Sequence, residues 1–243
     1  MARYFLELAY KGTEYHGFQI QDNAPTIQLE IEKALETLFK TRFDLTGSSR
    51  TDAGVHALQN YFHFDTNLQI TNRHKYNLNA ILPPDIAVKS IKTVADDAHC
   101  RFDAVARSYE YYIYQDKNPF LKDRGWFYPY ELDFSLLQQA ATLLKNHTDF
   151  TSFAKRNTQV FTHNCTIYVS EWSRAAAQQY IYKVQANRFL RGMVRGLVGT
   201  MLKVGRGQLS ISDFENIILA KDCTKADFST PPQGLFLAKV IYP

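Results

Sequence analysis

The stretch between Gly47 and Ala57, GSSRTDAGVHA, sets one cation and one anion among small residues. Arg50 and Asp52 flank Thr51, and no apolar period runs through them, which argues against the interior of an ordinary helix or strand. A carboxylate in a polar loop is ionised at neutral pH, and a nearby guanidinium favours that form further. Asp52 therefore suits the role of an anion or nucleophile better than that of a general acid. An Asx-turn with Gly54 at positive φ is the structural alternative.

A second unusual group lies between residues 188 and 204, where the apolar period predicts a helix. Three arginines would share one face of this helix: Arg188, Arg191 and Arg195. Three glycines would form an adjacent stripe, each costing about 0.8–1.0 kcal/mol relative to alanine: Gly192, Gly196 and Gly199. The stripe predicts that another segment approaches the helix backbone closely, with packing on a sheet as the simplest case. The arginine row favours phosphate or carboxylate partners.

Tyr109 lies in a predicted strand, between the basic residues Arg101 and Arg107 and a run of further tyrosines. Tyr109, Tyr111 and Ile113 alternate onto one face, which is typical of a buried core. The other interpretation is a platform on which an unstacked RNA base lies. The residues alone leave both open.

The hydrophobic patterns predict the elements that position these groups. In the first part we expect strands at 2–10, 60–65 and 86–94 and helices at 26–39 and 71–81. In the second we expect strands at 101–115, 166–172, 179–187 and 235–242 and helices at 134–145, 189–205 and 211–220, with a hairpin around 174–178. Asp133 is expected to cap the first of these last three helices, and Ser212 with Glu215 to form a capping box for the third. Two such series predict an α+β fold with two packed sheet units.

Composition narrows the class of protein. The 243 residues are 45% hydrophobic and 21% charged with a net charge of +4, so wholesale disorder is excluded and a polyanion partner would need locally grouped Lys and Arg. Three distant cysteines predict reduced thiols in the cytosol, and neither a signal peptide nor a membrane span is expected: Cys100, Cys165 and Cys223. No nucleotide-binding glycine motif, GxSxG elbow, RNP1 signature, complete metal-ligand set or second glycosidase carboxylate is recognisable.

GSSRTDAGVHA resembles the active-site motif of the tRNA pseudouridine synthase A family, usually GRTDAGVHA. RTDAGVH, and FLRGMVR followed by VGTML, are the specific motifs. Other segments resemble the family in the same order over almost the whole chain: YKGTEYHGFQIQ, NLNAILPPDIAV, RFDAVARSYEYYI, DFTSF, NRFLRGMVRGLVGTMLKVG and GLFLAKV.

The resemblance implies an isomerase that converts uridine to pseudouridine in tRNA. Asp52 matches the catalytic aspartate, and Arg50 matches the arginine that helps turn the target nucleotide out of its stack. Tyr109 matches the tyrosine that packs against the flipped base, and Arg195 the arginine that pairs with the catalytic carboxylate. Leu235 matches an apolar residue that lines the pocket.

The resemblance also implies an α+β fold of two RRM-like, ferredoxin-like halves whose largely antiparallel sheets join across a central RNA-binding cleft. The halves are expected at 1–104, with the aspartate loop, and at 105–243. A cytoplasmic homodimer is implied, acting without metal or organic cofactor on the 3′ side of the anticodon stem-loop (tRNA positions 38–40). On this interpretation the phosphate contacts are Arg188, Arg191 and Lys203.

Four positions depart from the family pattern, and they bear on the choice of target: Lys11, Phe18, Ser49 and Cys165. For the chemistry, attack of the carboxylate on C1′, addition to C6 of the ring and elimination at the sugar all stay open. Two alternatives remain for the function. One is a family member that acts on other RNA uridines, and the other is a tRNA-binding protein without turnover.

Overall fold

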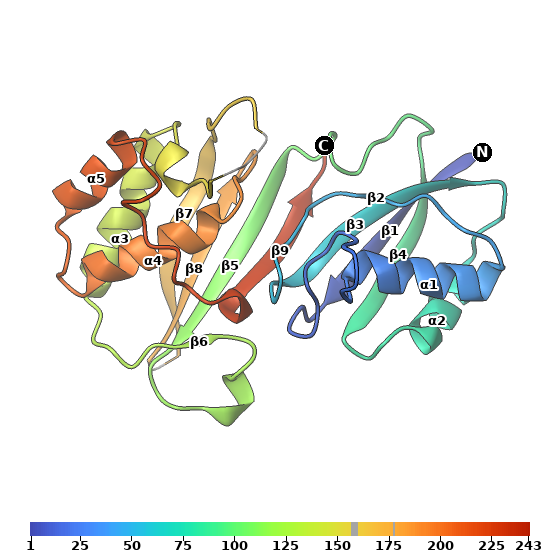
Figure 1. Cartoon of the computed structure of the whole chain (residues 1–243), viewed down its shortest axis with the longest axis horizontal. Helices are drawn as coiled ribbons and strands as arrows, with labels where there is room; N and C mark the ends of the chain where they lie inside the picture. Colours follow the sequence, from blue (N-terminus) through green and yellow to red (C-terminus); the bar gives the residue numbers. More distant parts are fainter. Residues whose placement is uncertain (157–159, 177) are drawn as a thin grey trace. The chain divides into compact units, whose positions relative to one another are not determined.

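The computed structural model describes residues 1–156, 160–176 and 178–243. They divide into two compact units. Figure 1 shows the chain coloured by sequence, from blue at the N-terminus to red at the C-terminus. Unit 1 consists of Met1–Val105 together with Phe236–Pro243, and unit 2 of Ala106–Leu235. Sequence order would assign the last eight residues to the second half, but their contacts lie with the first.

Unit 1 is built on a sheet in the order β4-β1-β3-β9, with β2 paired to β3. The pairs of β1 with β3 and β4 are antiparallel, whereas β9 runs parallel to β3 through His56–Phe236 and Ala57–Leu237. Helices α1 and α2 lie on the same side of this sheet (Figure 1). The elements are β1 (Ala2–Tyr10), α1 (Ile27–Phe39), β2 (Thr46–Gly47), β3 (His56–Thr66), α2 (Asn72–Ile81), β4 (Ile86–Val94) and β9 (Leu235–Ile241).

The core of unit 1 follows the two predicted periods. In β1 every second residue is buried: Tyr4, Leu6, Leu8 and Tyr10. In α1 the buried face has helical spacing: Ile27, Ile31, Ala34 and Leu35. Helix α1 begins where expected because the Thr26 hydroxyl accepts a hydrogen bond from the Leu29 N–H.

Unit 2 has an antiparallel sheet in the order β5-β8-β7, with β6 parallel to β5. Helices α3, α4 and α5 pack on one another, and α3 also packs on β7. Its strands are β5 (Ala106–Tyr114), β6 (Trp126–Phe127), β7 (Ile167–Ala176) and β8 (Gln179–Ala186). Its helices are α3 (Phe134–Leu143), α4 (Met193–Gly205) and α5 (Ile211–Leu219), with 3-10 turns η1 (Pro119–Leu121), η2 (Leu144–Asn146), η3 (Thr151–Phe153) and η4 (Pro232–Gly234).

The α+β class with largely antiparallel strands is therefore confirmed. The expected hairpin around 174–178 has its two strands in β7 and β8, and position 177 of its turn lies outside the described residues. Among the helices of the described residues, none is long and apolar enough to cross a membrane.

Three local predictions were wrong. The predicted helix from residue 188 starts only at Met193, because Gly192 adopts φ 75° and acts as the N-cap. The capping box of α5 is formed by Ser210 and Asp213, two residues earlier than expected, because the helix begins at Ile211 and its N-cap is therefore Ser210. Strand β5 starts at Ala106, since residues 99–103 form a hydrogen-bonded turn.

Candidate active site

The loop that carries Arg50 and Asp52 connects β2 to β3, and its first half is fixed by β3. The buried Asn60 side chain accepts a hydrogen bond from the Ser49 N–H (3.2 Å) and donates one to the Ser49 carbonyl (2.8 Å). The Ser48 N–H donates to the Tyr61 carbonyl at 2.8 Å. The Asn60 amide thus pairs the backbone N–H and C=O of Ser49, directly before Arg50, as a neighbouring strand would.

Thr51 is held from below. Its hydroxyl lies 2.8 Å from the Tyr10 hydroxyl, which also accepts a hydrogen bond from Asn60 Nδ2 at 3.1 Å. Thr51 is 7% exposed, Tyr10 5% and Asn60 0%. Because buried polar groups rarely lack partners, this closed network fixes the position of Thr51 between its two charged neighbours.

The N-terminal segment YKGTEYHGF packs directly under the loop. A Cβ on Gly12 would lie 2.0 Å from the Val55 carbonyl oxygen, so only glycine allows this approach. The Gly12 N–H donates to His56 Nδ1 at 3.0 Å, and the Gly54 N–H donates to the Tyr15 carbonyl at 3.2 Å. Gly54 has φ 77°, as the turn interpretation expected. The segment therefore shapes the loop around Asp52.

Phe18 continues this packing. It is 1% exposed and stacks on Phe62 with ring centroids 4.5 Å apart and an interplanar angle of 14°. A Cβ on Gly47 would lie 2.3 Å from the Phe18 ring. The departure from the family pattern at position 18 thus lies in the core beneath the loop.

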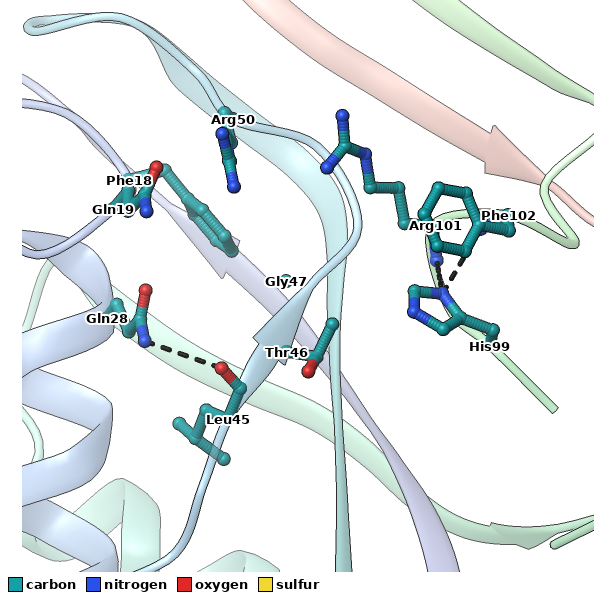
Figure 2. Close-up of a pocket in the computed structure, with 10 residues that line it drawn as sticks. All are labelled: Phe18, Gln19, Gln28, Leu45, Thr46, Gly47, Arg50, His99, Arg101 and Phe102. Atoms are coloured by element: carbon teal, nitrogen blue, oxygen red, sulfur yellow. Dashed lines mark hydrogen bonds between the residues drawn. The ribbon is translucent and has the colours of Figure 1, made fainter. Parts of the chain in front are cut away.

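These constraints leave Asp52 half-buried and Arg50 exposed, on either side of a buried threonine. Arg50 lies at the edge of a cavity of about 210 Å³ above β2, drawn in Figure 2. The opposite wall is the turn of His99, Arg101 and Phe102. This turn was missed, since residues 101–103 were expected to be the start of a strand.

In unit 2, Tyr109 lies on β5 opposite Val184 of β8 and is half-buried. Its ring meets Phe189 edge-to-face at 5.0 Å. Tyr111, on the same face of β5, is fully buried and donates its hydroxyl to the Pro231 carbonyl at 2.8 Å. Burial raises the pKa of Tyr111, and the nearby Arg195 acts in the opposite direction. The face of β5 thus changes from core at Tyr111 to partly open at Tyr109.

Arg195 lies on α4 and is tied to the segment after it. Its Nε donates to the Thr230 carbonyl at 2.6 Å, and the Thr230 hydroxyl donates to the Arg195 carbonyl at 2.8 Å. A Cβ on Gly199 would lie 2.4 Å from the Asp227 carbonyl oxygen. The predicted close approach to the α4 backbone is therefore confirmed at this glycine, although the partner is a chain segment and not a sheet. The same segment leads to Leu235, which is 7% exposed.

The predicted arginine row does not exist as a helix face. Arg188 and Arg191 lie in the connection between β8 and α4, and only Arg195 is helical. Lys203 lies in the last turn of α4 and pairs with Asp227 at 3.1 Å. Burial opposes ionisation of Asp227, but hydrogen bonds from Ser229 and the contact with Lys203 outweigh it and lower the pKa of Asp227.

The chemistry available in unit 1 is that of a half-buried carboxylate beside an exposed cation, and in unit 2 that of an aromatic face, a cation and an apolar side chain. Within the described ranges, no group of three His, Cys, Asp or Glu side chains could hold a metal ion.

Comparisons with known proteins agree on one family. The family model described as tRNA pseudouridine synthase matches residues 8–103 and 140–243. The chain is 42% identical over 251 residues to tRNA pseudouridine synthase A of Porphyromonas gingivalis, covering 100% of this chain and 98% of the relative. It is 45% identical over 243 residues to the Bacteroides fragilis protein of that name (99% and 96%) and 39% identical over 241 residues to that of Staphylococcus aureus strain MRSA252 (98% and 91%).

Proposed function

The chain belongs to the tRNA pseudouridine synthase family and is an isomerase of tRNA uridine, and we propose that Asp52 is its nucleophile. The observation that carries this proposal is the buried Thr51, which the Tyr10–Asn60 network fixes between an accessible carboxylate and an accessible guanidinium. A reacting group must be held to a fraction of an ångström by its supports, and this loop has them.

The reaction is an isomerisation within one nucleotide, so it needs no second substrate. The N1–C1′ glycosidic bond of uridine breaks and a C5–C1′ bond forms in the same nucleotide, while N1 gains a proton and C5 loses one. No electrons are gained or lost, so no redox partner enters. Asp52 would attack C1′ or C6, or support an elimination at the sugar.

The target base must first leave its stack, which costs a few kcal/mol. We propose that Arg50, exposed at the tip of the loop, fills the space that the base leaves. Tyr109, Leu235 and Arg195 have the roles implied by the family resemblance: covering the flipped base, lining its pocket and pairing with the nucleophile. Arg188, Arg191 and Lys203 contact phosphates.

We further propose the finer features of the family for this chain: RRM-like units, a cytoplasmic homodimer, and uridines of the anticodon stem-loop as targets. For unit 1, support comes from the β1-α1-β3-α2-β4 series and the sheet order β4-β1-β3.

The test is to incubate the protein, without added cofactor, with an unmodified tRNA transcript and to map pseudouridine by position. Wild type should form it in the 3′ side of the anticodon stem-loop, and Asp52→Asn should bind tRNA but form none. Asp44→Asn, the same change at an exposed carboxylate of unit 1, is the matched control and should keep full activity. Turnover by Asp52→Asn would refute the nucleophile. Product at other positions would favour other uridine targets.

A further inference from the structure

The turn opposite Arg50 is built to be rigid. The His99 N–H donates to Asp103 Oδ2 at 2.6 Å, and the Asp103 N–H donates back to the His99 carbonyl at 3.0 Å. His99 Nδ1 accepts from the N–H groups of Arg101 (3.1 Å) and Phe102 (3.3 Å). The side chains of Arg101 and Phe102 therefore extend from a backbone that the His99 imidazole fixes.

Cys100 anchors this turn to the sheet. It is fully buried, its Sγ lies 3.2 Å from the Thr46 carbonyl, and its N–H donates to His63 Nδ1 at 3.3 Å. Burial lowers the pKa of His63, and this favours the neutral ring that can accept the bond. The Tyr242 hydroxyl donates to the Cys100 carbonyl at 2.6 Å. The turn is thus tied to β2, to β3 and to the C-terminal residues.

This rigid turn presents an aromatic ring to solvent. Phe102 is 73% exposed, although its ring lies 4.2 Å from that of His99 and 5.5 Å from the Arg101 guanidinium. Single exposed apolar residues are common on loose surfaces. The backbone of this turn is held by several hydrogen bonds, so the exposed Phe102 ring has a defined position.

The cavity between the turn and the loop has the character of an anion site. Figure 2 shows Arg50 and Arg101 extending toward the same space from opposite walls. The lining, all within the described part of unit 1, includes no Asp or Glu. Gln28 donates its Nε2 hydrogens to Glu32 (2.8 Å) and to the Leu45 carbonyl (3.4 Å), and its Oε1 is turned the other way as an acceptor (Figure 2). Guanidinium groups form charge-assisted hydrogen bonds with phosphate oxygens, so this lining suits an anion.

We propose that this cavity binds one nucleotide of the tRNA strand next to the target uridine, with its phosphate on Arg101 and its base on Phe102. The proposal rests on the proposed function. The Cα atoms of Arg50 and Asp52 are at most about 7 Å apart, and for this reason we place the nucleotide next to the one at the carboxylate. The volume of about 210 Å³ is below the roughly 300–1,000 Å³ of sites for whole small ligands, which favours part of a polymer. Stacking on aromatic rings and charge-assisted bonds to phosphate are how unpaired RNA is bound.

The test combines Phe102 variants with RNA that lacks single bases. Binding of an anticodon stem-loop RNA is measured for wild type, Phe102→Ala, Phe102→Leu and Phe102→Tyr, and then with each nucleotide around the target made abasic. Loss of a stacked base should weaken binding roughly tenfold, so Phe102→Ala and Phe102→Leu should lose this much and Phe102→Tyr little. One abasic position beside the target should cause the same loss in wild type and no further loss in Phe102→Ala. Arg101→Gln should lower the slope of log K against log salt by about 0.7.

Phe120→Ala is the matched control, because Phe120 is 78% exposed in unit 2 and belongs to no proposed site. It should bind like wild type. If wild type forms pseudouridine but no abasic position couples to Phe102, the subsite is refuted while the function stands. If Phe102→Ala instead changes the melting temperature or the oligomeric state with no coupling, the ring has a packing role and the subsite is again refuted. If wild type forms no pseudouridine, the proposed function itself fails.

Discussion

The Tyr10 hydroxyl is the point at which the support of the Asp52 loop can be removed with the least other change. Phenylalanine keeps the ring in the core and deletes the bonds to Thr51 Oγ1 (2.8 Å) and from Asn60 Nδ2 (3.1 Å). The Thr51 hydroxyl and one Asn60 hydrogen are then left buried without this partner, at about 1–3 kcal/mol each. We expect Tyr10→Phe to lower the free energy of unfolding by about 2–6 kcal/mol, and the melting temperature by about 4–24 °C for a chain of this size.

The larger effect should be on turnover. Thr51 is the neighbour of Asp52, and a displacement of about 1 Å at a reacting group can cost about 10²-fold in rate. In single-turnover assays with tRNA we expect Tyr10→Phe to lower the rate of pseudouridine formation at least about tenfold, with affinity for tRNA nearly unchanged. Thr51→Val removes the Tyr10–Thr51 bond from the other side, so the double variant should lose little more than Tyr10→Phe alone.

Tyr4→Phe is the control on the same strand. Tyr4 is 6% exposed on the same face of β1, and its hydroxyl makes long bonds of 3.4 Å with the Leu68 carbonyl and the Ile70 N–H, away from the loop. It should cost less than about 1 kcal/mol and leave turnover intact. Wild-type turnover in Tyr10→Phe, or an equal loss in Tyr4→Phe, would refute the view that this network holds Asp52.

Two further changes test other supports. In Gly12→Ala the new Cβ would lie 2.0 Å from the Val55 carbonyl oxygen, so the free energy of unfolding in urea and the turnover rate should both fall strongly. Gly207→Ala is the control, because its Cβ meets no atom within 4 Å. It should cost only the roughly 1–2 kcal/mol of strain that a φ of 69° imposes on a residue with a side chain. Hydrogen bonds from Lys221 and Thr151 hold the pKa of Asp149 at about 2, so its ionised form stabilises the fold above about pH 4 and this contribution disappears as the pH falls toward 2. Asp149→Asn should weaken the pH dependence of the urea unfolding midpoint over that range. If this pH dependence stays as in wild type, the Asp149 interactions do not contribute to it.

Much of the fold was predictable because its elements are periodic. The helix capped by Thr26 and the alternating strand β1 appear where the pattern placed them. The start of α4 could not be predicted, because the apolar period continues across Gly192 and does not reveal that its φ is 75°. Arg188 and Arg191 were consequently placed on a face that the backbone never forms.

The candidate site shows the same division. Arg50 and Asp52 stand out because their functional groups are adjacent in sequence. Their supports, Tyr10 and Asn60, come from two strands whose pairing puts Asn60 opposite Leu8. This register depends on the whole sheet, so no local pattern could show that one amide and one phenol fix the loop.

The turn of residues 99–103 shows why an incorrect strand assignment matters for function. As part of a strand, Arg101 and Phe102 would point to opposite faces, and no joint role would follow. The bonds to His99 Nδ1 instead curl the backbone so that both side chains line one cavity with Arg50. A ring and a cation beside one space match a base and its phosphate, and Asp52 follows Arg50 by only two residues in the same loop. Recognition of the strand beside the target and chemistry on the target can then share a single rigid piece of unit 1.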